Sequence, residues 1–345
     1  MPLYQEEKKP KIKGVSYAKY GYLFSLPFIV IFLIFMLYPT LFTAVIGFTD
    51  FKGVVATSFK FLEHPFDNFA SIIANKTFRA SLVNTIVIWV MNFIPQIGLA
   101  LLLTAWFTNR SRKIRGQGAF KVIFYLPNII TAATVAILYA SIFAYPVGPV
   151  NDILQSCQKF FFGTIKGLTG PELQAMIKPF DFSTSPWAAK IVVAFIQFWQ
   201  WYGYTTIILI SGVLGINPEL FEAAEIDGAS PRQTFFQITL PCMRTILIFT
   251  LITSLIGGLN MFDIPKLYIW NGGPANATMT TSVFIYAQAF SGTYLYNKAA
   301  AASMIMFVII AVLSAVTFYL MRDRSEAKAV RAMKRIEKLR KGAAI

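Results

Sequence analysis

Four carboxylates lie close together in one short stretch of the chain: Glu219, Glu222, Glu225 and Asp227. Between residues 215 and 244 only Arg232 and Arg244 carry positive charge. Carboxylates displayed together can pair with basic groups in a groove of another protein, and Glu222 is our candidate for such a pair. These residues predict recognition of a protein partner by the segment 215–244, the acidic loop.

Local sequence predicts two short helices in the acidic loop. Asn217 is suited to cap a helix that starts with Pro218, and Gly228 can adopt the positive φ that ends it. Ser230-Pro231 is a second start signal, and Pro241 interrupts the helix that follows. The first helix is predicted to have a face of mostly small residues at i, i+3, i+4 and i+7 spacing: Leu220, Ala223, Ala224 and Asp227. Exposed alanines allow another protein to approach the helix backbone closely.

The elements that must position this loop are predicted to cross a membrane. The chain has 345 residues, 56% of them hydrophobic and only 14% charged, with a mean hydropathy of +0.58. A helix of roughly 20 residues crosses a hydrocarbon core of about 30 Å. The apolar segments of that length are residues 21–46, 81–107, 120–143, 188–214, 245–262 and 299–320. They lack the alternation of barrel strands, so the predicted fold class is an all-α membrane protein with six transmembrane helices.

The basic residues predict the orientation of these helices. With the N-terminus inside, the inner segments are residues 1–20, 108–121, 215–244 and 321–345, and the outer ones are 47–80, 144–187 and 263–298. The inner segments then carry 21 of the 31 lysines and arginines, and the outer segments carry nine. Cytoplasmic loops are enriched in these residues, so both termini are predicted to be cytoplasmic. We therefore attribute the net charge of +15 to topology rather than to nucleic-acid binding, with the tail 321–345 lying against anionic lipid headgroups.

Several chemistries are disfavoured by the sequence. It contains no Gly-x-x-x-x-Gly-Lys-Ser/Thr motif, so the usual phosphate-binding loop for ATP is missing. His64 is the only histidine and lies in a predicted outer loop, which argues against a metal cluster or a histidine proton relay. Asp263, the best candidate for an acid within the membrane, lies at the end of the fifth apolar segment, whereas ion coupling usually needs carboxylates nearer the middle. We expect no catalytic residue and no metal site in this chain.

The acidic loop carries a family resemblance. Glu222-Ala223-Ala224, then Gly228, then Ile238-Thr239-Leu240-Pro241 resemble in type and spacing the EAA loop of bacterial ABC import permeases. Further motifs resemble the carbohydrate branch of that family, which contains the maltose permease: Asn271-Gly272-Gly273-Pro274 with Thr278, Tyr125-Leu126-Pro127, and Gly148 to Asn151. The resemblance spans residues 20–321. The sequence departs from the family pattern in having Thr245 where proline often stands and a longer outer loop at 144–187.

The resemblance implies a six-helix permease domain at residues 21–320 in a bacterial cytoplasmic membrane. It implies as partners a second homologous permease, two ATPase subunits that use ATP and Mg, and an external solute-binding protein. The chain itself is then no enzyme and holds no cofactor. The residues implied to couple it to the ATPase are Glu222, Ala223, Ala224, Asp227, Gly228, Ala229, Ile238, Leu240 and Pro241.

The resemblance also implies that sugar is held by the helices on either side of the acidic loop. In the fourth segment Gln197, Trp201 and Tyr204 share one helical face with Gln200 beside them, and in the fifth Gly258, Leu259 and Phe262 do so beside Asn260. Amides hydrogen-bond hydroxyl groups, and aromatic rings pack on the C–H faces of sugars. The two glycines at 257 and 258 are predicted to leave space for a ligand. The alternative role for all these residues is packing between helices.

The predicted function is ATP-driven import of a sugar or oligosaccharide, with the acidic loop linking ATPase closure to alternating access. The few charges within the apolar segments favour an uncharged substrate. Three alternatives remain at this point: a permease for another solute such as glycerol phosphate, a polyamine or an amino acid; an ion-coupled secondary carrier; and a membrane scaffold or receptor that uses the loop for docking. The last two belong to other functional classes, and the carrier leaves the acidic loop unexplained.

Overall fold

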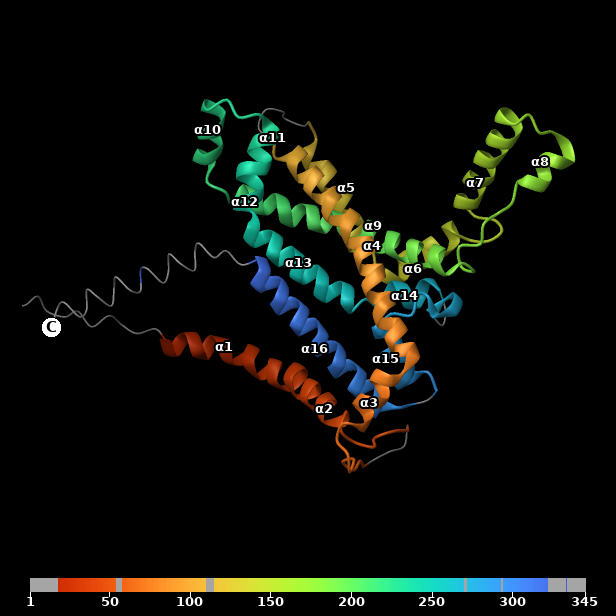
Figure 1. Ribbon diagram of the computed structural model, residues 1–345. Coiled ribbons are helices and arrows are strands. Elements are labelled where there is room, and N and C mark those ends of the chain that lie inside the picture. The colour runs from red at the N-terminus through yellow and green to blue at the C-terminus, as the bar shows by residue number, and fades with distance from the viewer. Residues whose placement is uncertain are drawn as a thin grey trace, which may run out of the picture.

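The computed structural model describes residues 18–53, 58–109, 115–269, 272–292, 294–321 and 333. Within these ranges the chain is helical and forms no β-strand, only an isolated bridge between Thr49 and Phe61. Most of the predicted N-terminal segment 1–20, and nearly all of the tail 321–345, lie outside the described residues. Figure 1 shows long helices that come together near one end and spread apart toward the other.

Four helical stretches are each long and apolar enough to cross a membrane: Lys19–Ile46, Lys76–Phe107, Arg244–Tyr268 and Tyr296–Met321. The first comprises α1 (Ala18–Phe32), a π-helical turn and α2 (Tyr38–Ile46); the second is α4 (Lys76–Phe107); the third contains α13 (Arg244–Leu259) and α14 (Asp263–Tyr268); the last is α16 (Tyr296–Met321). Two bent pairs also qualify: α5 (Gln117–Ile129) with α6 (Ala132–Ile142), and α9 (Pro186–Leu214) with α10 (Pro218–Ile226). The described chain therefore has four to six candidate spans.

The third apolar segment is not the single straight helix that its length predicts. Its two helices, α5 and α6, meet at 93° across an extended residue, Ile130. Pro127 removes a backbone donor in the last turn of α5, and Thr131 caps the start of α6. The side-chain amide of Gln200 donates to the carbonyl oxygen of Ile130 at 3.2 Å. Irregular backbone is tolerated at membrane depth when the protein supplies such a partner.

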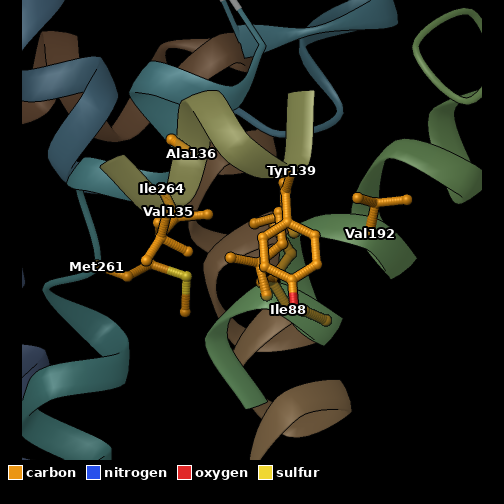
Figure 2. Close-up of a cluster of buried hydrophobic side chains, with 10 residues drawn as sticks. Ile88, Val135, Ala136, Tyr139, Val192, Met261 and Ile264 are labelled. Carbon is orange, nitrogen blue, oxygen red and sulfur yellow. The ribbon is translucent and has the colours of Figure 1, made fainter. Parts of the chain in front are cut away.

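Helix α9 lies at the centre of the fold and packs against α4 and α5. A Cβ atom on Gly203 would lie 1.7 Å from the carbonyl oxygen of Phe124, so the backbones of α5 and α9 touch at a point that only glycine allows. Figure 2 shows the main apolar cluster, where residues from α4, α6, α9, α14 and the turn before α14 converge: Ile88, Val135, Ala136, Tyr139, Val192, Val193, Ala194, Ile196, Met261 and Ile264. This cluster fixes the relative positions of the helices that carry the site.

The remaining helices lie near the ends of the long ones. They are α3 (Asp67–Ala74), α7 (Pro149–Lys159), α8 (Gly170–Met176), α11 (Pro231–Thr234), α12 (Leu240–Cys242) and α15 (Thr281–Phe290). In Figure 1 α7 and α8 extend away from the other helices. Asn151 anchors this extension, because its amide nitrogen donates to the carbonyl oxygens of Ala144 and Phe180 and its oxygen accepts from the backbone of Phe180. The predicted outer loop 144–187 is thus a helical arm tied together at its base.

Candidate functional site

A cavity of about 440 Å³ lies between α4, α9 and α13; we call it the central cavity. Seven of the eight predicted path residues line it: Gln197, Gln200, Trp201, Tyr204, Gly258, Asn260 and Phe262. Leu259 does not; it is 1% exposed and packs with Leu255 and Met306 instead. The structure thus brings together amides and aromatic rings from the two helices on either side of the acidic loop.

The α9 wall of the cavity has an ordered set of rings and amides. Trp201 and Tyr204 meet edge to face with ring centroids 5.6 Å apart, and Tyr204 stacks on Tyr125 of α5 at 6.5 Å. Gln200 is 7% exposed, and its amide nitrogen is bonded to Ile130 at the bend between α5 and α6. Gln200 therefore supports the wall, whereas Trp201 is 43% exposed and lines the cavity with its ring.

Helix α4 supplies a third wall, which the sequence reasoning missed. Trp89, Asn92 and Gln96 line the cavity, and the amide nitrogen of Gln96 donates to the hydroxyl of Thr205 on α9 at 2.7 Å. Thr250, Thr253 and Ser254 add hydroxyl groups from α13. A signal was available, because Asn92 and Gln96 are polar residues four apart in an apolar segment, and polar residues in membrane helices usually face the protein interior.

The two glycines of α13 have different surroundings. A Cβ on Gly257 would have no atom within 4 Å, so this position leaves space, as predicted. A Cβ on Gly258 would lie 1.9 Å from Cδ1 of Trp89, so the indole ring already fills the space there. The Trp89 indole N–H donates to the hydroxyl of Ser254 at 3.4 Å. Gly258 therefore allows α4 and α13 to pack closely rather than providing ligand volume.

The cavity has a mixed lining of apolar and polar side chains that is almost uncharged. Of the described residues that line it, Asp263 alone has an ionisable carboxylate or basic group, and it lies at the start of α14 beyond the end of α13. The rest of the polar lining consists of amides, hydroxyls, a phenol and indoles. Such a lining can hydrogen-bond hydroxyl groups and pack on C–H surfaces without a charged partner.

The acidic loop has the first short helix that its sequence predicts and a second helical stretch after it. The second stretch runs from α11 through a π-helical turn at Phe235–Thr239 into α12, so Pro241 does not interrupt it as predicted. Asn217 caps α10 by accepting from the backbone of Glu219 at 3.1 Å. Gly228, with φ +72°, ends it: Gly228 N–H donates to the carbonyl of Glu225 and Ala229 N–H to that of Ala224, which is a Schellman motif. Ser230 and Gln233 form a capping box at the start of α11. Local hydrogen bonds therefore determine the shape of this loop.

Helix α10 packs one face against the protein and exposes the opposite face. Ala224 is 6% exposed, and Phe221 packs on an apolar cluster of α4, α9 and Met243. Glu222 and Ala223 are exposed, and Ile226 is 86% exposed. The predicted small-residue face is thus divided, since Ala224 points inward and Ala223 outward. Ile226 is an exposed apolar residue that the sequence reasoning did not single out.

The other predicted loop residues are distributed around this helix. Asp227 is the exposed C-cap of α10, Ala229 and Ile238 are half-buried, Leu240 is half-buried and Pro241 is exposed. A second cavity, of about 620 Å³, separates the loop from the C-terminal part of α4 and is lined on opposite sides by Leu102 and Trp106 and by Phe235 and Phe236. The loop is therefore held by the packing of Phe221 and Ala224 and by its continuous connections to α9 and α13.

The remaining family-like motifs have structural roles. Gly272 and Gly273 adopt positive φ in the turn between α14 and α15, where Thr278 N–H donates to the carbonyl of Gly272 at 2.8 Å. Asn84 of α4 holds this turn by donating to the carbonyl of Asn276 at 2.8 Å. Asn271 lies outside the described residues.

Comparison with known proteins identifies relatives along most of the chain. A family model described as "Binding-protein-dependent transport system inner membrane component" matches residues 68–330. The lactose transport system permease protein LacF of Rhizobium radiobacter is 31% identical over 305 residues, which is 88% of this chain and 94% of LacF. The arabinooligosaccharides transport system permease protein AraP of Bacillus subtilis (strain 168) is 26% identical, covering 92% of this chain and 94% of AraP.

A solved structure shares the fold. It is a bacterial ABC transporter involved in the import of the acidic polysaccharide alginate, with a TM-score of 0.69 and 22% identity over 89% of this chain and 96% of the matched chain. The family match and the similarity to LacF both cover far more than half of the sequence. This chain belongs to the family of inner membrane components of binding-protein-dependent transport systems.

Proposed function

We propose that this chain is the permease subunit of an ATP-driven, binding-protein-dependent importer of a sugar or oligosaccharide. The observation that carries the proposal is that α9 and α13, the two helices joined by the acidic loop, both line one cavity of amides, hydroxyls and rings. Among the relatives, LacF is named for lactose and AraP for arabinooligosaccharides. Helices α9 and α13 thus connect the proposed binding site in the cavity to the proposed partner site in the acidic loop.

The lining of the central cavity favours a neutral, hydroxyl-rich substrate. A glycerol phosphate, polyamine or amino acid carries charge, and burying charge without a partner is costly. The described lining offers the carboxylate of Asp263 alone, at the end of the cavity near α14. The same position makes Asp263 a poor carboxylate for ion coupling. Trp201 and Tyr204 provide ring surface, and Gln197 provides an amide for hydroxyl groups.

The acidic loop is the proposed docking site for an ATPase subunit. The exposed side of α10 presents Glu222, Ala223 and Ile226, a combination of charge, close backbone approach and apolar surface that suits a groove with a basic group. The coupling set extends through Asp227, Gly228 and Ala229 to Ile238, Leu240 and Pro241. ATP and Mg belong to the ATPase partners in this proposal, and the permease itself has no cofactor.

Coupling then follows from the way the loop is attached. Helix α13 has 16 residues, so it is roughly 24 Å long, and it begins at the loop and lines the cavity from Thr250 onward. Closure of the ATPase dimer displaces α10, and α9 and α13 move with it and change the side from which the cavity is reached. ATPase and substrate bias one equilibrium between inward-facing and outward-facing states, which is the physical content of coupling.

The proposed setting is the bacterial cytoplasmic membrane, with six spans and both termini in the cytoplasm. In this arrangement α5 with α6 forms the third span and α9 forms the fourth. The first span, Lys19–Ile46, has only 6% of its most apolar window buried within the chain, so in this proposal it faces lipid and the second permease subunit. An external solute-binding protein delivers the substrate.

The test is uptake by the complete transporter in which Gln197, Trp201 and Tyr204 are all changed to alanine. We expect sugar uptake to fall strongly while the ATPase still copurifies, because the changes are in the cavity and not in the loop. Ile191→Ala is the matched control, since Ile191 is an exposed residue of the same helix and does not line the cavity. Unchanged uptake kinetics in the triple variant would refute the assignment of the cavity.

A further inference from the structure

Aromatic side chains continue from the central cavity along the loops at the far end of α13. Phe262 lines the cavity and contacts Tyr286 of α15, with ring centroids 5.2 Å apart. Tyr286 contacts Phe290 at 5.3 Å, and Phe290 contacts Tyr296 of α16 at 6.1 Å. Tyr296 contacts Phe51 at 5.6 Å. We call this unbroken series of rings the aromatic ladder.

The ladder is built on a frame that hydrogen bonds hold in place. Phe51 belongs to the loop after α2, and its carbonyl oxygen accepts from the backbone of Asn297 at 3.0 Å. Gly53 N–H donates to the carbonyl of Tyr294 at 2.9 Å, so the loop is joined to the start of α16. Segments far apart in sequence therefore place the rings in a defined order, and only the tertiary fold brings them together.

Two rings of the ladder keep open surface. Tyr286 is 38% exposed and Phe290 is 58% exposed. The ammonium group of Lys266 lies 5.0 Å from the centre of the Tyr286 ring. Apart from this contact the series consists of ring faces and edges, which attract the C–H faces of sugars.

The volume of the central cavity suggests what the ladder binds. Ligand pockets typically measure about 300–1,000 Å³, so a cavity of about 440 Å³ accommodates only a small ligand. A longer oligosaccharide must extend beyond it, and Phe262 marks the place where the rings continue. Aromatic residues also gather at membrane interfaces, but that role does not require the series to start inside a cavity. The ladder does start there, at Phe262.

We propose that the aromatic ladder is an extended binding site for an oligosaccharide, whose leading sugar unit occupies the central cavity while following units pack on Tyr286 and Phe290. This inference rests on the proposed function and deepens it, because it assigns a substrate of several sugar units. A substrate of one or two units would make little contact with the ladder.

The test compares sugars of different length in proteoliposomes that contain the complete transporter and saturating binding protein. The probes are lactose and arabino- and malto-oligosaccharides from the disaccharide to the hexasaccharide. In Tyr286→Leu/Phe290→Leu we expect the uptake rate of the longest probes to fall roughly tenfold and that of disaccharides less than about twofold, because only a long chain reaches both rings. Leucine keeps apolar volume, and Tyr286→Phe/Phe290→Tyr, which keeps both rings, should restore the rate.

Phe66→Ala is the matched control, because Phe66 is a 69% exposed ring that contacts Phe48 and Phe69 and is not part of the ladder. Equal loss for all lengths would show a structural role for the rings and overturn the inference, as would no loss at all or restriction of the unaltered transporter to disaccharides. If the unaltered transporter takes up none of these sugars, the result contradicts the proposed function itself and not only the extended binding site. The amount of each variant in the membrane is measured to identify a folding defect. If the leucine variant is poorly folded, the uptake of long and short probes by Tyr286→Phe/Phe290→Tyr decides whether the rings act in binding.

Discussion

The acidic loop and the central cavity belong to the same two helices, α9 and α13, but different interactions shape them. In the loop, Asn217, Gly228 and Ser230 satisfy backbone groups only a few residues away. In the cavity, Gln96 bonds to Thr205, Gln200 to Ile130, and Trp89 packs on Gly258, so every support joins different helices. A change in the loop should therefore act on partner docking, whereas a change in the cavity should act on helix packing or substrate.

The largest effect should come from Gly228→Pro. Gly228 has φ +72° and donates its N–H to Glu225, whereas proline requires φ near −65° and has no N–H. We expect ATP-driven uptake to be almost abolished while the protein still inserts in the membrane, as measured by transport assays and membrane fractionation. Gly228→Asn should retain most activity, since asparagine tolerates this conformation. Normal uptake in the proline variant would contradict the coupling role of α10.

Glu222→Lys should have the next largest effect. Reversing a charge at a proposed interface costs about 2–5 kcal/mol, which corresponds to more than tenfold weaker docking. The measurement is copurification of the ATPase together with sugar-stimulated ATP hydrolysis. Gln237→Lys introduces the same side chain at another exposed position of the loop, with a change of one charge unit rather than two, and should have little effect. If both variants lose the ATPase equally, net charge rather than the position of Glu222 determines docking.

Gly258→Ala tests the cavity side of the comparison. The added methyl group would overlap the Trp89 ring, and overpacking of this kind costs about 1–3 kcal/mol. We expect a lower midpoint of thermal unfolding in detergent, and a much smaller effect of Gly258→Ala when it is introduced into a Trp89→Ala background. Gly257→Ala is an adjacent control with open space around its Cβ. Equal destabilisation by the two alanine substitutions would show that the Trp89 contact is unimportant.

The smallest effect should come from Gln96→Leu. The change removes the hydrogen bond between Gln96 and Thr205, and such bonds between membrane helices contribute about 0.6 kcal/mol on average and up to about 2. A double-mutant cycle with Thr205→Val, followed by thermal unfolding, measures this contribution directly. ATPase copurification should remain normal in all variants of the cycle. Additive losses would indicate that the two side chains do not interact.

The sequence by itself determined the helical membrane class, the approximate limits of the long helices and the shape of the acidic loop. Membrane-crossing segments depend on length and hydropathy, and caps such as Asn217 and Gly228 act on neighbouring residues, so both can be read from consecutive positions. The face of Gln197, Trp201 and Tyr204 followed from helical spacing alone. None of these inferences required contacts between distant segments.

Only the tertiary structure decided the contents of the cavity wall and the course of the third apolar segment. The bend at Ile130 depends on Gln200 of another helix, and the inward position of Leu259 depends on Leu255 and Met306. Gly258 looked like free space in the sequence, but it is the place where Trp89 of α4 packs. Helices that are apolar on most sides leave their rotation and their neighbours undetermined by sequence pattern, and close packing between helices settles both.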